Sequence, residues 1–489
     1  MSQTLDDPSV LPCPVPNELL IAGQWRPARS GAGFEVADPA SGQTLARIAD
    51  AGAADAVAAL DAATAAARQW RHTPARARAD ILLDAYYAVL RRRDEFAELM
   101  TLEMGKPLAE AHGELDYGAD FLRWFAEEAV RIDGGYAHSP NGRGRIVVTR
   151  QPVGPCLLIT PWNFPLAMAT RKIAPALAAG CTIVVKPSEL TPLTTLLFAE
   201  QLMRSGIPAG VVNVLTTTDP GAVVTPLLAD GRIRKLSFTG STEVGRMLLA
   251  QCGPQVVRSS MELGGNAPFV VFEDAELEAA VDAAVLAKLR NMGEACTAAN
   301  RIFVQNGIRA EFASRLAERF GQLRMGHGLD PASQIGPLIE QAAVDKVQSL
   351  VADARQRGAR VLVGGQPPVG PGHFYPPTVL DEVSADAQLM RSEIFGPVAP
   401  VIGFDTEDEA VTRANDTEYG LAAYLFTNDL SRAIRMSEAL DFGMVGVNQG
   451  IVSNAAAPFG GIKASGLGRE GGHEGIGEYL DTKYLALNV

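Results

Sequence analysis

The sequence predicts an α/β protein built from two doubly wound units and a separate β-hairpin arm. Three observations lead to this fold class. From Cys156 onward, short apolar strands alternate with helical stretches, and a second alternating series follows Cys296. Such alternation predicts parallel sheets with helices on both faces. Ahead of the first series, glycine-containing turns between residues 133 and 142 bound a hairpin.

Helical periodicity dominates the first quarter of the chain, after a proline-rich start that we expect to be mobile. Apolar residues recur there at the spacing of amphipathic helices. The predicted helices are Ala51–Gln69, Arg78–Leu99, Glu103–Ala111 and Phe121–Val130. This region supplies helices rather than strands to the first unit.

A hairpin follows these helices. Asp133–Gly135 and Ser139–Gly142 are turn sequences, and Arg145–Arg150 alternates in the manner of a strand. The C-terminal segment Tyr484–Val489 can add another strand to the hairpin. Because an unpaired strand edge invites pairing with a second chain, we expect this arm to join two subunits.

Two series of strands complete the prediction. The first series is Cys156–Thr160, Thr182–Lys186, Val211–Leu215 and Lys235–Thr239. The second is Arg301–Val304, Arg360–Val363, Ala423–Thr427 and Val445–Val447. Each series predicts one α/β unit.

The composition excludes several classes of function. The chain of 489 residues has a formal net charge of −13 and no basic cluster, so we expect neither a nucleic-acid partner nor a membrane surface. No apolar stretch reaches the roughly 20 residues of a membrane helix, and the start around Asp6 and Asp7 lacks a signal-peptide pattern. The five cysteines and six histidines are scattered, so we expect no metal site and a reducing, cytoplasmic location.

Two segments contain residues suited to covalent chemistry at a carbonyl. Cys296 lies in the run Arg290–Arg301, and Glu262 lies beside two glycines in Met261–Asn266. A thiol can attack a carbonyl, and a carboxylate can then activate water. A single cysteine is more often a packing residue than a nucleophile. From the residues alone, Glu262 is equally a base or a surface carboxylate.

Two further runs suit a dinucleotide, because ligands bind at the carboxyl ends of the strands in such sheets. Lys186–Glu189 follows a strand, where Lys186 can bind ribose hydroxyls and Glu189 can accept from a 2′-hydroxyl while repelling a 2′-phosphate. Phe238–Gly245 runs from a strand into a helix whose N–H groups can face a pyrophosphate. This run is not G-x-G-x-x-G, and a simple N-cap by Ser241 or Thr242 explains it equally well.

Several runs together resemble the NAD(P)-dependent aldehyde dehydrogenase superfamily, and within it the succinate-semialdehyde dehydrogenases. They are Thr160–Pro165, Lys186–Glu189, Phe238–Ser241, Glu262–Asn266, the Cys296 segment, Glu393–Pro397 and Pro458–Gly461. The resemblance implies a Rossmann-type cofactor domain, an α/β catalytic domain and a β-hairpin oligomerisation arm. The implied bounds are 1–129 and 151–261 for the cofactor domain, 262–442 for the catalytic domain, 443–474 for a return segment at their interface, and 130–150 with 475–489 for the arm.

The resemblance also implies roles for matched positions. Cys296 is the expected nucleophile, Glu262 the base, and Asn163 the side-chain donor of an oxyanion hole that the Cys296 N–H completes. A thiol of ordinary pKa is mostly protonated at pH 7, so we expect the site to favour the thiolate. The residues expected at the cofactor are Thr160, Trp162, Lys186, Ser188, Glu189, Gly240, Ser241, Gly245, Leu263, Glu393 and Phe395. We expect NAD as the cofactor because of Glu189, with NADP possible through Ser188 and Lys186.

Three positions bear on the substrate. In succinate-semialdehyde dehydrogenases, residues matching Arg171, Arg290 and Ser453 bind the distal carboxylate of the substrate. The resemblance therefore implies oxidation of succinate semialdehyde to succinate. Glutarate semialdehyde or a broad range of aldehydes is the alternative. A cysteine hydrolase or acyl transferase is disfavoured, because no histidine lies near the Cys296 segment. The family adds a homotetramer to the homodimer predicted from the arm.

Overall fold

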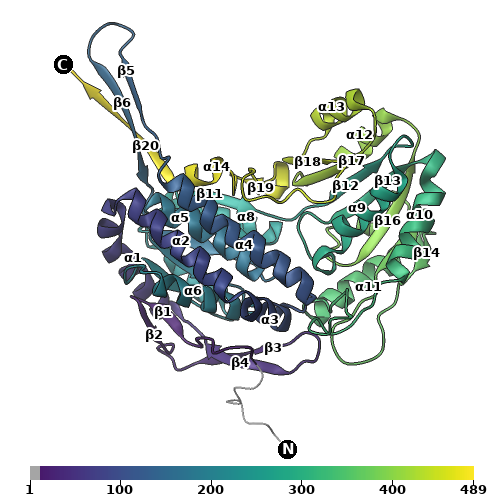
Figure 1. The fold of residues 1–489 in the computed structure, drawn as a ribbon, viewed down its shortest axis with the longest axis horizontal. Coiled ribbons are helices and arrows are strands. Elements are labelled where there is room, and N and C mark those ends of the chain that lie inside the picture. Colours follow the sequence, from purple (N-terminus) through teal and green to yellow (C-terminus); the bar gives the residue numbers. More distant parts are fainter. Residues whose placement is uncertain (1–10, 489) are drawn as a thin grey trace, which may run out of the picture.

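The protein, described by a computed structural model over residues 11–488, has two α/β lobes and one projecting arm (Figure 1). The predicted mobile start falls mostly on the first ten residues, which lie outside that range. The chain builds most of the first lobe, crosses to the second, and returns to the first before it ends in the arm. No helix of the described residues is long and apolar enough to cross a membrane.

The first lobe is built on an eight-stranded sheet of order β19-β11-β10-β7-β8-β9-β1-β2. Its five central strands are parallel, whereas β19, β1 and β2 run antiparallel to their neighbours. The strands are β1 (Leu19–Ile21), β2 (Gln24–Arg26), β7 (Cys156–Ile159), β8 (Ile183–Lys186), β9 (Val212–Val214), β10 (Lys235–Thr239), β11 (Arg258–Glu262) and β19 (Gly466–Leu467). All four predicted strands of the first series are confirmed within one residue at each end.

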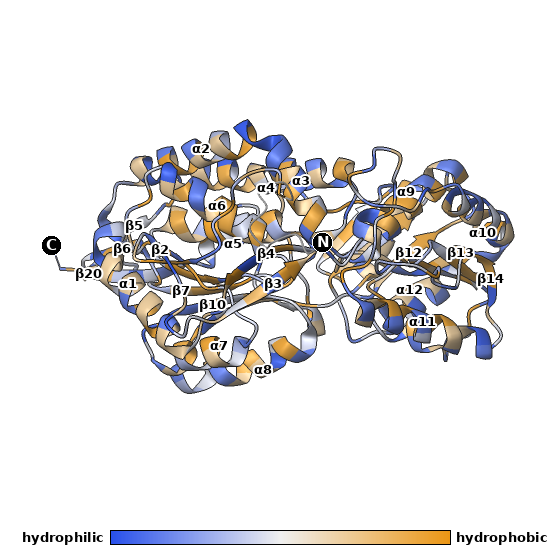
Figure 2. Ribbon diagram, turned by 90° about the horizontal axis from the view of Figure 1, so that it is seen from below, coloured by the Kyte–Doolittle hydropathy of each residue, from blue (hydrophilic) through white to orange (hydrophobic). Residues whose placement is uncertain are grey.

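Helices cover both faces of this sheet, as Figure 2 shows. Because side chains alternate along a strand, Cys156 and Leu158 pack in one core cluster, whereas Leu157 and Ile159 pack in another. The helices of this lobe are α1 (Ala53–His72), α2 (Ala75–Arg91), α3 (Arg93–Met104), α4 (Leu108–Ala129), α5 (Pro165–Ala179), α6 (Leu193–Arg204), α7 (Pro220–Ala229), α8 (Thr242–Cys252) and the single turn α14 (Glu474–Gly477).

The boundaries of three predicted helices are wrong. The predicted helix Arg78–Leu99 is divided at Arg92, whose guanidinium is paired with Glu95 and Glu200 at the break. The predicted helix Glu103–Ala111 is interrupted, because Gly105 has a φ of +95° and ends α3. Pro107 precedes α4, which begins well before the predicted Phe121.

The second lobe is built on a seven-stranded sheet of order β14-β15-β16-β13-β12-β17-β18, parallel except for β14. Its strands are β12 (Ala267–Val271), β13 (Ala299–Gln305), β14 (Arg360–Val363), β15 (Thr378–Asp381), β16 (Val398–Phe404), β17 (Ala422–Phe426) and β18 (Met444–Val447). Its helices are α9 (Leu277–Leu289), α10 (Asn306–Gly321), α11 (Gln341–Gln356), α12 (Glu407–Asn415) and α13 (Leu430–Ala439). The four predicted strands of the second series are confirmed, whereas β12, β15 and β16 were not predicted.

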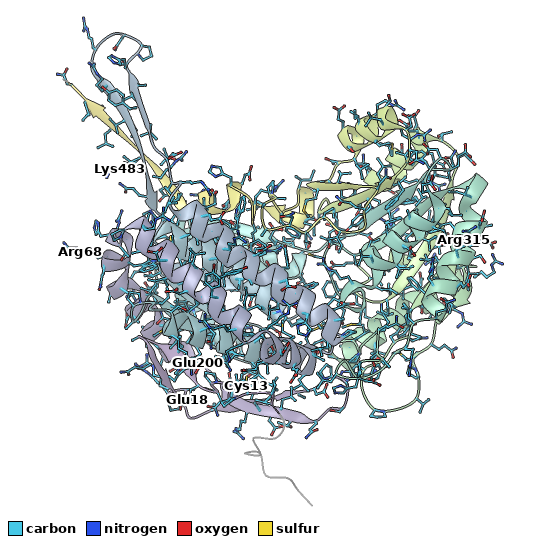
Figure 3. All side chains as sticks on the ribbon, in the orientation of Figure 1. Cys13, Glu18, Arg68, Glu200, Arg315 and Lys483 are labelled. Atoms are coloured by element: carbon cyan, nitrogen blue, oxygen red, sulfur yellow. The ribbon has the colours of Figure 1, made fainter. Side chains whose placement is uncertain are left out.

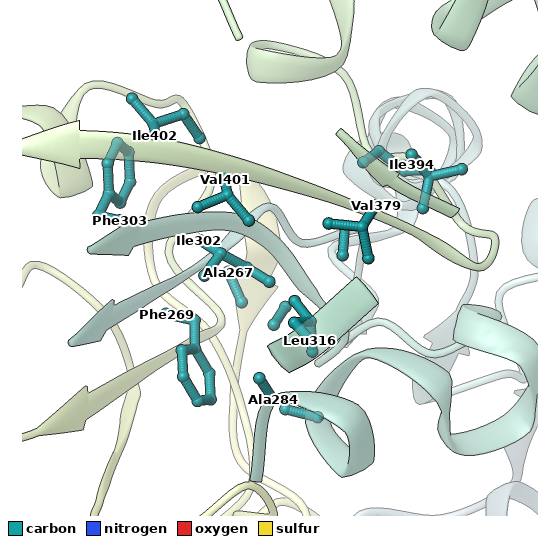
Figure 4. Packing of buried hydrophobic residues seen from close by; sticks show 14 of the residues in the cluster. Ala267, Phe269, Ala284, Ile302, Phe303, Leu316, Val379, Ile394, Val401 and Ile402 are labelled. Carbon is teal, nitrogen blue, oxygen red and sulfur yellow. The ribbon is translucent and has the colours of Figure 1, made fainter. Parts of the chain in front are cut away.

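One cluster of apolar residues forms the core of this lobe. Phe269, Ile302 and Val401 are register partners on three neighbouring strands, and Figure 4 shows them near Leu316 of α10. This packing fixes β13, which begins three residues after Cys296. The nucleophile segment therefore leads directly into a rigid strand.

The arm is a three-stranded antiparallel sheet of order β20-β6-β5. The predicted hairpin is confirmed as β5 (Gly135–His138) and β6 (Arg145–Pro152). The predicted C-terminal strand Tyr484–Val489 is confirmed over Tyr484–Leu487, which belong to β20 (Leu480–Leu487); Val489 lies outside the described residues. Figure 3 shows Lys483 on the arm, and Tyr136, Tyr484, Leu485 and Leu487 are exposed there. The chain start adds a two-stranded sheet, β3 (Gly33–Ala37) and β4 (Thr44–Ala49), which was not predicted.

Candidate active site

Two adjoining cavities form one cleft; the larger lies where the two lobes meet, and the smaller lies within the first lobe. The larger, of about 440 Å³, is lined by all six residues predicted for catalysis and substrate: Asn163, Arg171, Glu262, Arg290, Cys296 and Ser453. The smaller, of about 300 Å³, is lined by Thr160, Lys186, Ser188 and Glu189. Pro161, Trp162, Thr239 and Gly240 line both. Residues far apart in the sequence are thus gathered along one continuous cleft.

Cys296 follows a turn whose backbone is strained. Asn291 and Met292 have φ values of +56° and +54°, a conformation that costs free energy in residues other than glycine. The turn leads through Glu294 to Cys296 and then into β13. Gly265 packs against it, since a Cβ there would lie 2.3 Å from the Cys296 carbonyl oxygen. The surroundings therefore hold the backbone of the thiol-bearing residue in one position.

The Asn163 amide is fixed beside this turn. Its Nδ2 donates to the Glu294 carbonyl at 2.9 Å, which uses one of its two hydrogens. Its own backbone carbonyl accepts from Lys106 Nζ at 2.8 Å and from Asn291 Nδ2 at 3.1 Å. Lys106 is in turn paired with the fully buried Glu114. One amide hydrogen of Asn163 thus remains for a ligand.

Glu262 is the last residue of β11 rather than part of a turn, and its side chain is buried. Neither carboxyl oxygen has a hydrogen-bond partner within residues 11–488. Burial, with a contribution from Glu470, raises the pKa of Glu262 well above its ordinary value, although Arg171, Lys172 and Arg469 oppose the shift. Glu262 therefore keeps its proton to a higher pH than an ordinary glutamate does and becomes a base as the pH rises.

The surroundings of Cys296 also favour the neutral thiol. Burial raises its pKa to about 12, against the opposing effect of Arg171 and Arg290. We expected the site to favour the thiolate. The described residues contradict this expectation, because desolvation, with Glu393 and Glu262, outweighs the two guanidinium groups.

The two predicted arginines differ in their surroundings. Arg171, on α5, is fully buried, with its Nε 2.5 Å from Glu470 Oε2 and its guanidinium 4.2 Å from the centre of the Phe459 ring. Glu470 also pairs with Lys172 Nζ at 2.5 Å. Arg290 lies 4.9 Å from the centre of the Phe164 ring and forms no ion pair with a carboxylate of the described chain. Arg290 therefore brings to the cavity a positive charge that no ion pair of the described chain engages, whereas Arg171 is paired with Glu470, which it shares with Lys172.

The smaller cavity suits an adenosine group. Val224 and Leu248 give it apolar walls, and Lys186 Nζ lies 2.8 Å from Glu189 Oε2 at its edge. The buried Thr160 and Thr239 hydroxyls have no partner among residues 11–488. Buried polar groups are normally paired, so these hydroxyls fit a polar ligand such as a dinucleotide.

The start of α8 lies between the two cavities. Ser241 is its N-cap, with Oγ accepting from the Val244 N–H at 3.3 Å, so the N-cap interpretation is confirmed. Ser241 also lines the larger cavity. Gly245 lines neither cavity; it packs on Leu263, where a Cβ would lie 2.4 Å from a methyl carbon.

Glu393 and Phe395 lie across the cleft, on the second lobe. Glu393 Oε1 accepts from the Gly265 N–H at 3.0 Å, and burial raises the pKa of Glu393 to about 7. Phe395 has a φ of +52° and meets Trp162 edge to face at 5.4 Å. With Leu263 they line the larger cavity.

Sequence reasoning missed other residues of the larger cavity, among them Tyr117, Met168, Glu340, Lys346 and Phe459. It also missed Glu470. Tyr117 lies on α4, far along the chain from every recognised run, so only the packing of α4 against α5 brings it to the cavity. Phe459 lies in the run Pro458–Gly461, and Glu470 follows a short distance after it. That run was the only sequence signal that could have pointed to these two residues.

A half-buried thiol in a cleft formed by two adjoining cavities, with unpaired buried hydroxyls beside the second, is typical of the thiol-dependent oxidoreductases. The chain belongs to the aldehyde dehydrogenase family, which it matches over residues 25–485. It is therefore an enzyme that oxidises aldehydes with NAD or NADP.

Curated relatives and solved structures agree with this family. The chain is 58% identical to the succinate-semialdehyde dehydrogenase of Paenarthrobacter nicotinovorans over 91% of its own length and 98% of the relative's. It is 49% identical to the NADP(+) succinate-semialdehyde dehydrogenase GabD of Escherichia coli, over 96% and 98%. The crystal structure of succinate-semialdehyde dehydrogenase from Burkholderia pseudomallei has a TM-score of 0.96 at 48% identity, with 100% of both chains covered.

Proposed function

We propose that this enzyme oxidises succinate semialdehyde to succinate with NAD. The observation that carries the proposal is Arg290, a cation without a carboxylate partner in the described chain, in the same cavity as Cys296. A short aldehyde whose far end is a carboxylate fits this arrangement, because a guanidinium binds a carboxylate through charge-assisted hydrogen bonds. The names of the relatives support the same substrate.

The first chemical step falls to Cys296 and Asn163. The Cys296 thiol gives up its proton to water, the resulting thiolate attacks the aldehyde carbon, and the carbonyl oxygen becomes an oxyanion. The free Nδ2 hydrogen of Asn163 and the Cys296 N–H donate to that oxyanion. One such donor is typically worth about 3 kcal/mol in the transition state. The bond from Asn163 to the Glu294 carbonyl keeps the amide oriented before the substrate arrives.

The cofactor is held by residues of both lobes. Lys186, Ser188 and Glu189 hold the adenosine ribose, Gly240 and Ser241 the pyrophosphate, and Glu393 and Phe395 the nicotinamide ribose, with Thr160, Trp162 and Leu263 lining the cleft. Gly245 contributes through its packing on Leu263. When bound, the oxidised nicotinamide supplies a positive charge and accepts the hydride that leaves the substrate carbon.

Glu262 completes the reaction. The acyl group remains on Cys296 as a thioester, and Glu262 removes a proton from the water that hydrolyses it. The raised pKa of Glu262 makes it basic enough for this task once the pH approaches that pKa. The rate of hydrolysis is therefore expected to rise with pH until Glu262 is fully ionised.

Selection of the carboxylate is tested by replacing Arg290. In Arg290→Ala, kcat/KM for succinate semialdehyde should fall roughly 10- to 150-fold, since a hydrogen bond to a charged group is worth about 1.5–3 kcal/mol. The value for butanal, which has no carboxylate, should change less than about threefold. Arg315→Ala on the outer surface of α10 is the matched control.

Arg171→Ala is expected to act differently, because it leaves Glu470 and Lys172 without part of their network beside Glu262. It should lower activity on both aldehydes. If both arginine variants leave the ratio of the two activities unchanged, neither arginine selects a carboxylate and the proposed substrate is wrong.

Glu189 is proposed to set the preference for NAD. A 2′-phosphate placed near its carboxylate is repelled, although Lys186 neutralises part of that charge at 2.8 Å. Glu189→Ser should shift the ratio of kcat/KM for NADP to that for NAD upward by at least about tenfold. The exposed Glu438→Ser is the control. A wild-type enzyme that clearly prefers NADP would contradict this role.

Glutarate semialdehyde is the alternative substrate. It is longer by one methylene, which is worth about 0.8 kcal/mol of apolar burial, so the two semialdehydes should differ only severalfold in kcat/KM. Hydrolase chemistry remains disfavoured: no histidine of residues 11–488 lines either cavity, and such a role would leave the cofactor cleft without a purpose.

The assembly is proposed from the arm. Its exposed Tyr136, Tyr484, Leu485 and Leu487 favour contact with a second copy, giving a homodimer or a pair of dimers. We propose the domain bounds implied by the resemblance with one change: because β6 ends at Pro152, the arm extends to that residue. The five free thiols support a reducing, cytoplasmic location.

A further inference from the structure

The side chain of Glu294 has no role in the mechanism above, yet it is the most completely buried carboxyl group near Cys296. It is 0% exposed and lies two residues before the thiol. Its Oε1 accepts from the Ile339 N–H at 3.2 Å, and its Oε2 has no partner among the described residues. A carboxylate in such a place is costly unless it is paired.

The backbone of Glu294 connects the two parts of the site. Its N–H donates to the Asn291 carbonyl at 2.8 Å within the strained turn. Its carbonyl accepts from Asn163 Nδ2 at 2.9 Å and from Asn291 Nδ2 at 3.1 Å. The orientation of the Asn163 amide therefore depends on where the Glu294 carbonyl lies.

The side chain of Glu294 also helps to hold the Glu294 carbonyl in place. Ile339 belongs to the segment before α11 that lines the larger cavity together with Glu340. The single bond from Glu294 to Ile339 thus joins the Cys296 turn to the cavity wall. A side chain that accepts one hydrogen bond and carries no charge is sufficient for this contact.

The charges around Glu294 do not supply a counter-ion. Lys106 is the nearest cation, but it is already paired with Glu114. The exposed Glu340 and the half-buried Glu110, which accepts from the Asn291 N–H, add negative charge to the same region. Burial raises the pKa of Glu294 well above its ordinary value, which agrees with this charge count.

We propose that Glu294 is a positioning residue that works as a neutral carboxylic acid, holding the carbonyl that orients Asn163. This inference rests on the proposed roles of Asn163 and Cys296. Ionisation of Glu294 at alkaline pH would place a negative charge beside the thiolate and the oxyanion. Ionisation of Glu294 should therefore lower the activity of the wild-type enzyme at high pH. Ionisation of Glu262 and Cys296 should instead raise the activity as the pH rises.

The test compares Glu294→Gln, which is neutral and nearly isosteric, with Glu294→Ala, and uses Glu438→Gln as a surface control. Glu294→Ala should lower kcat at least tenfold with little change in KM, and Glu294→Gln should restore most of that loss at pH 7. Between pH 7 and 10, kcat/KM of Glu294→Gln should keep rising where the wild type falls.

The alkylation rate of Cys296 by iodoacetamide, followed by peptide mass without cofactor, gives a second readout. At alkaline pH it should be higher in Glu294→Gln than in the wild type. Failure of Glu294→Gln to fold or to rescue activity, or pH profiles identical to the wild type in both measurements, would overturn the proposal. Full activity in Cys296→Ala would instead overturn the proposed function on which it rests.

Discussion

Replacing Glu262 with glutamine is expected to leave one rapid turnover per active site and to block the turnovers that follow. Glutamine keeps the shape of the buried side chain but cannot accept a proton from water. Attack by Cys296 and formation of the thioester do not require Glu262 in the proposed mechanism, so one equivalent of reduced cofactor should appear at 340 nm. The steady-state rate should then fall roughly 10²- to 10⁴-fold, the usual contribution of a general base.

Hydroxylamine provides the control for this variant. It attacks a thioester without a general base, so it should restore turnover in Glu262→Gln. Glu438→Gln, on the surface of the second lobe, should behave as the wild type. A variant of Glu262 that shows no initial burst would mean that this carboxyl group acts before the acyl group is formed.

Replacing Cys296 with alanine is expected to have the largest effect of any single change. Removal of a nucleophile lowers kcat by up to about 10⁶-fold in comparable cases. Cofactor binding, measured by titration of the quenching of tryptophan fluorescence, should be retained, because the cleft residues other than Cys296 are unchanged. Cys13→Ala is the matched control, since Cys13, labelled in Figure 3, lines neither cavity of the cleft.

Local pattern was enough to predict most of the fold. Runs such as Ile183–Lys186 are short and apolar and end in recognisable turns, so the sequence identifies them as strands of a parallel sheet. The missed strands lack that pattern. β16 contains Pro400, and β12 contains Pro268 directly after the glycine turn that packs on Cys296. Their pairing depends on neighbours that are distant in the sequence.

The candidate site was likewise predicted only in part from the sequence. Short runs around Cys296, Glu262 and Asn163 predict which groups gather in the cleft, and these residues do line one cavity. The pKa values and ion pairs of the site residues could not be predicted from the sequence. Burial outweighs the guanidinium groups at Cys296, and Glu470 pairs with Arg171 although it lies almost 300 residues later in the chain. Both effects arise from three-dimensional packing, which no local pattern encodes.

The covalent thioester on Cys296 is the central feature of this account, and one measurement tests it most directly. Glu262→Gln is mixed with NAD and succinate semialdehyde, quenched in acid after the burst, and digested for peptide mass analysis. The account predicts one succinyl group per subunit on the peptide that contains Cys296, and its loss after hydroxylamine treatment. An unmodified Cys296 peptide after a full burst, or an acyl group on another residue, would contradict it.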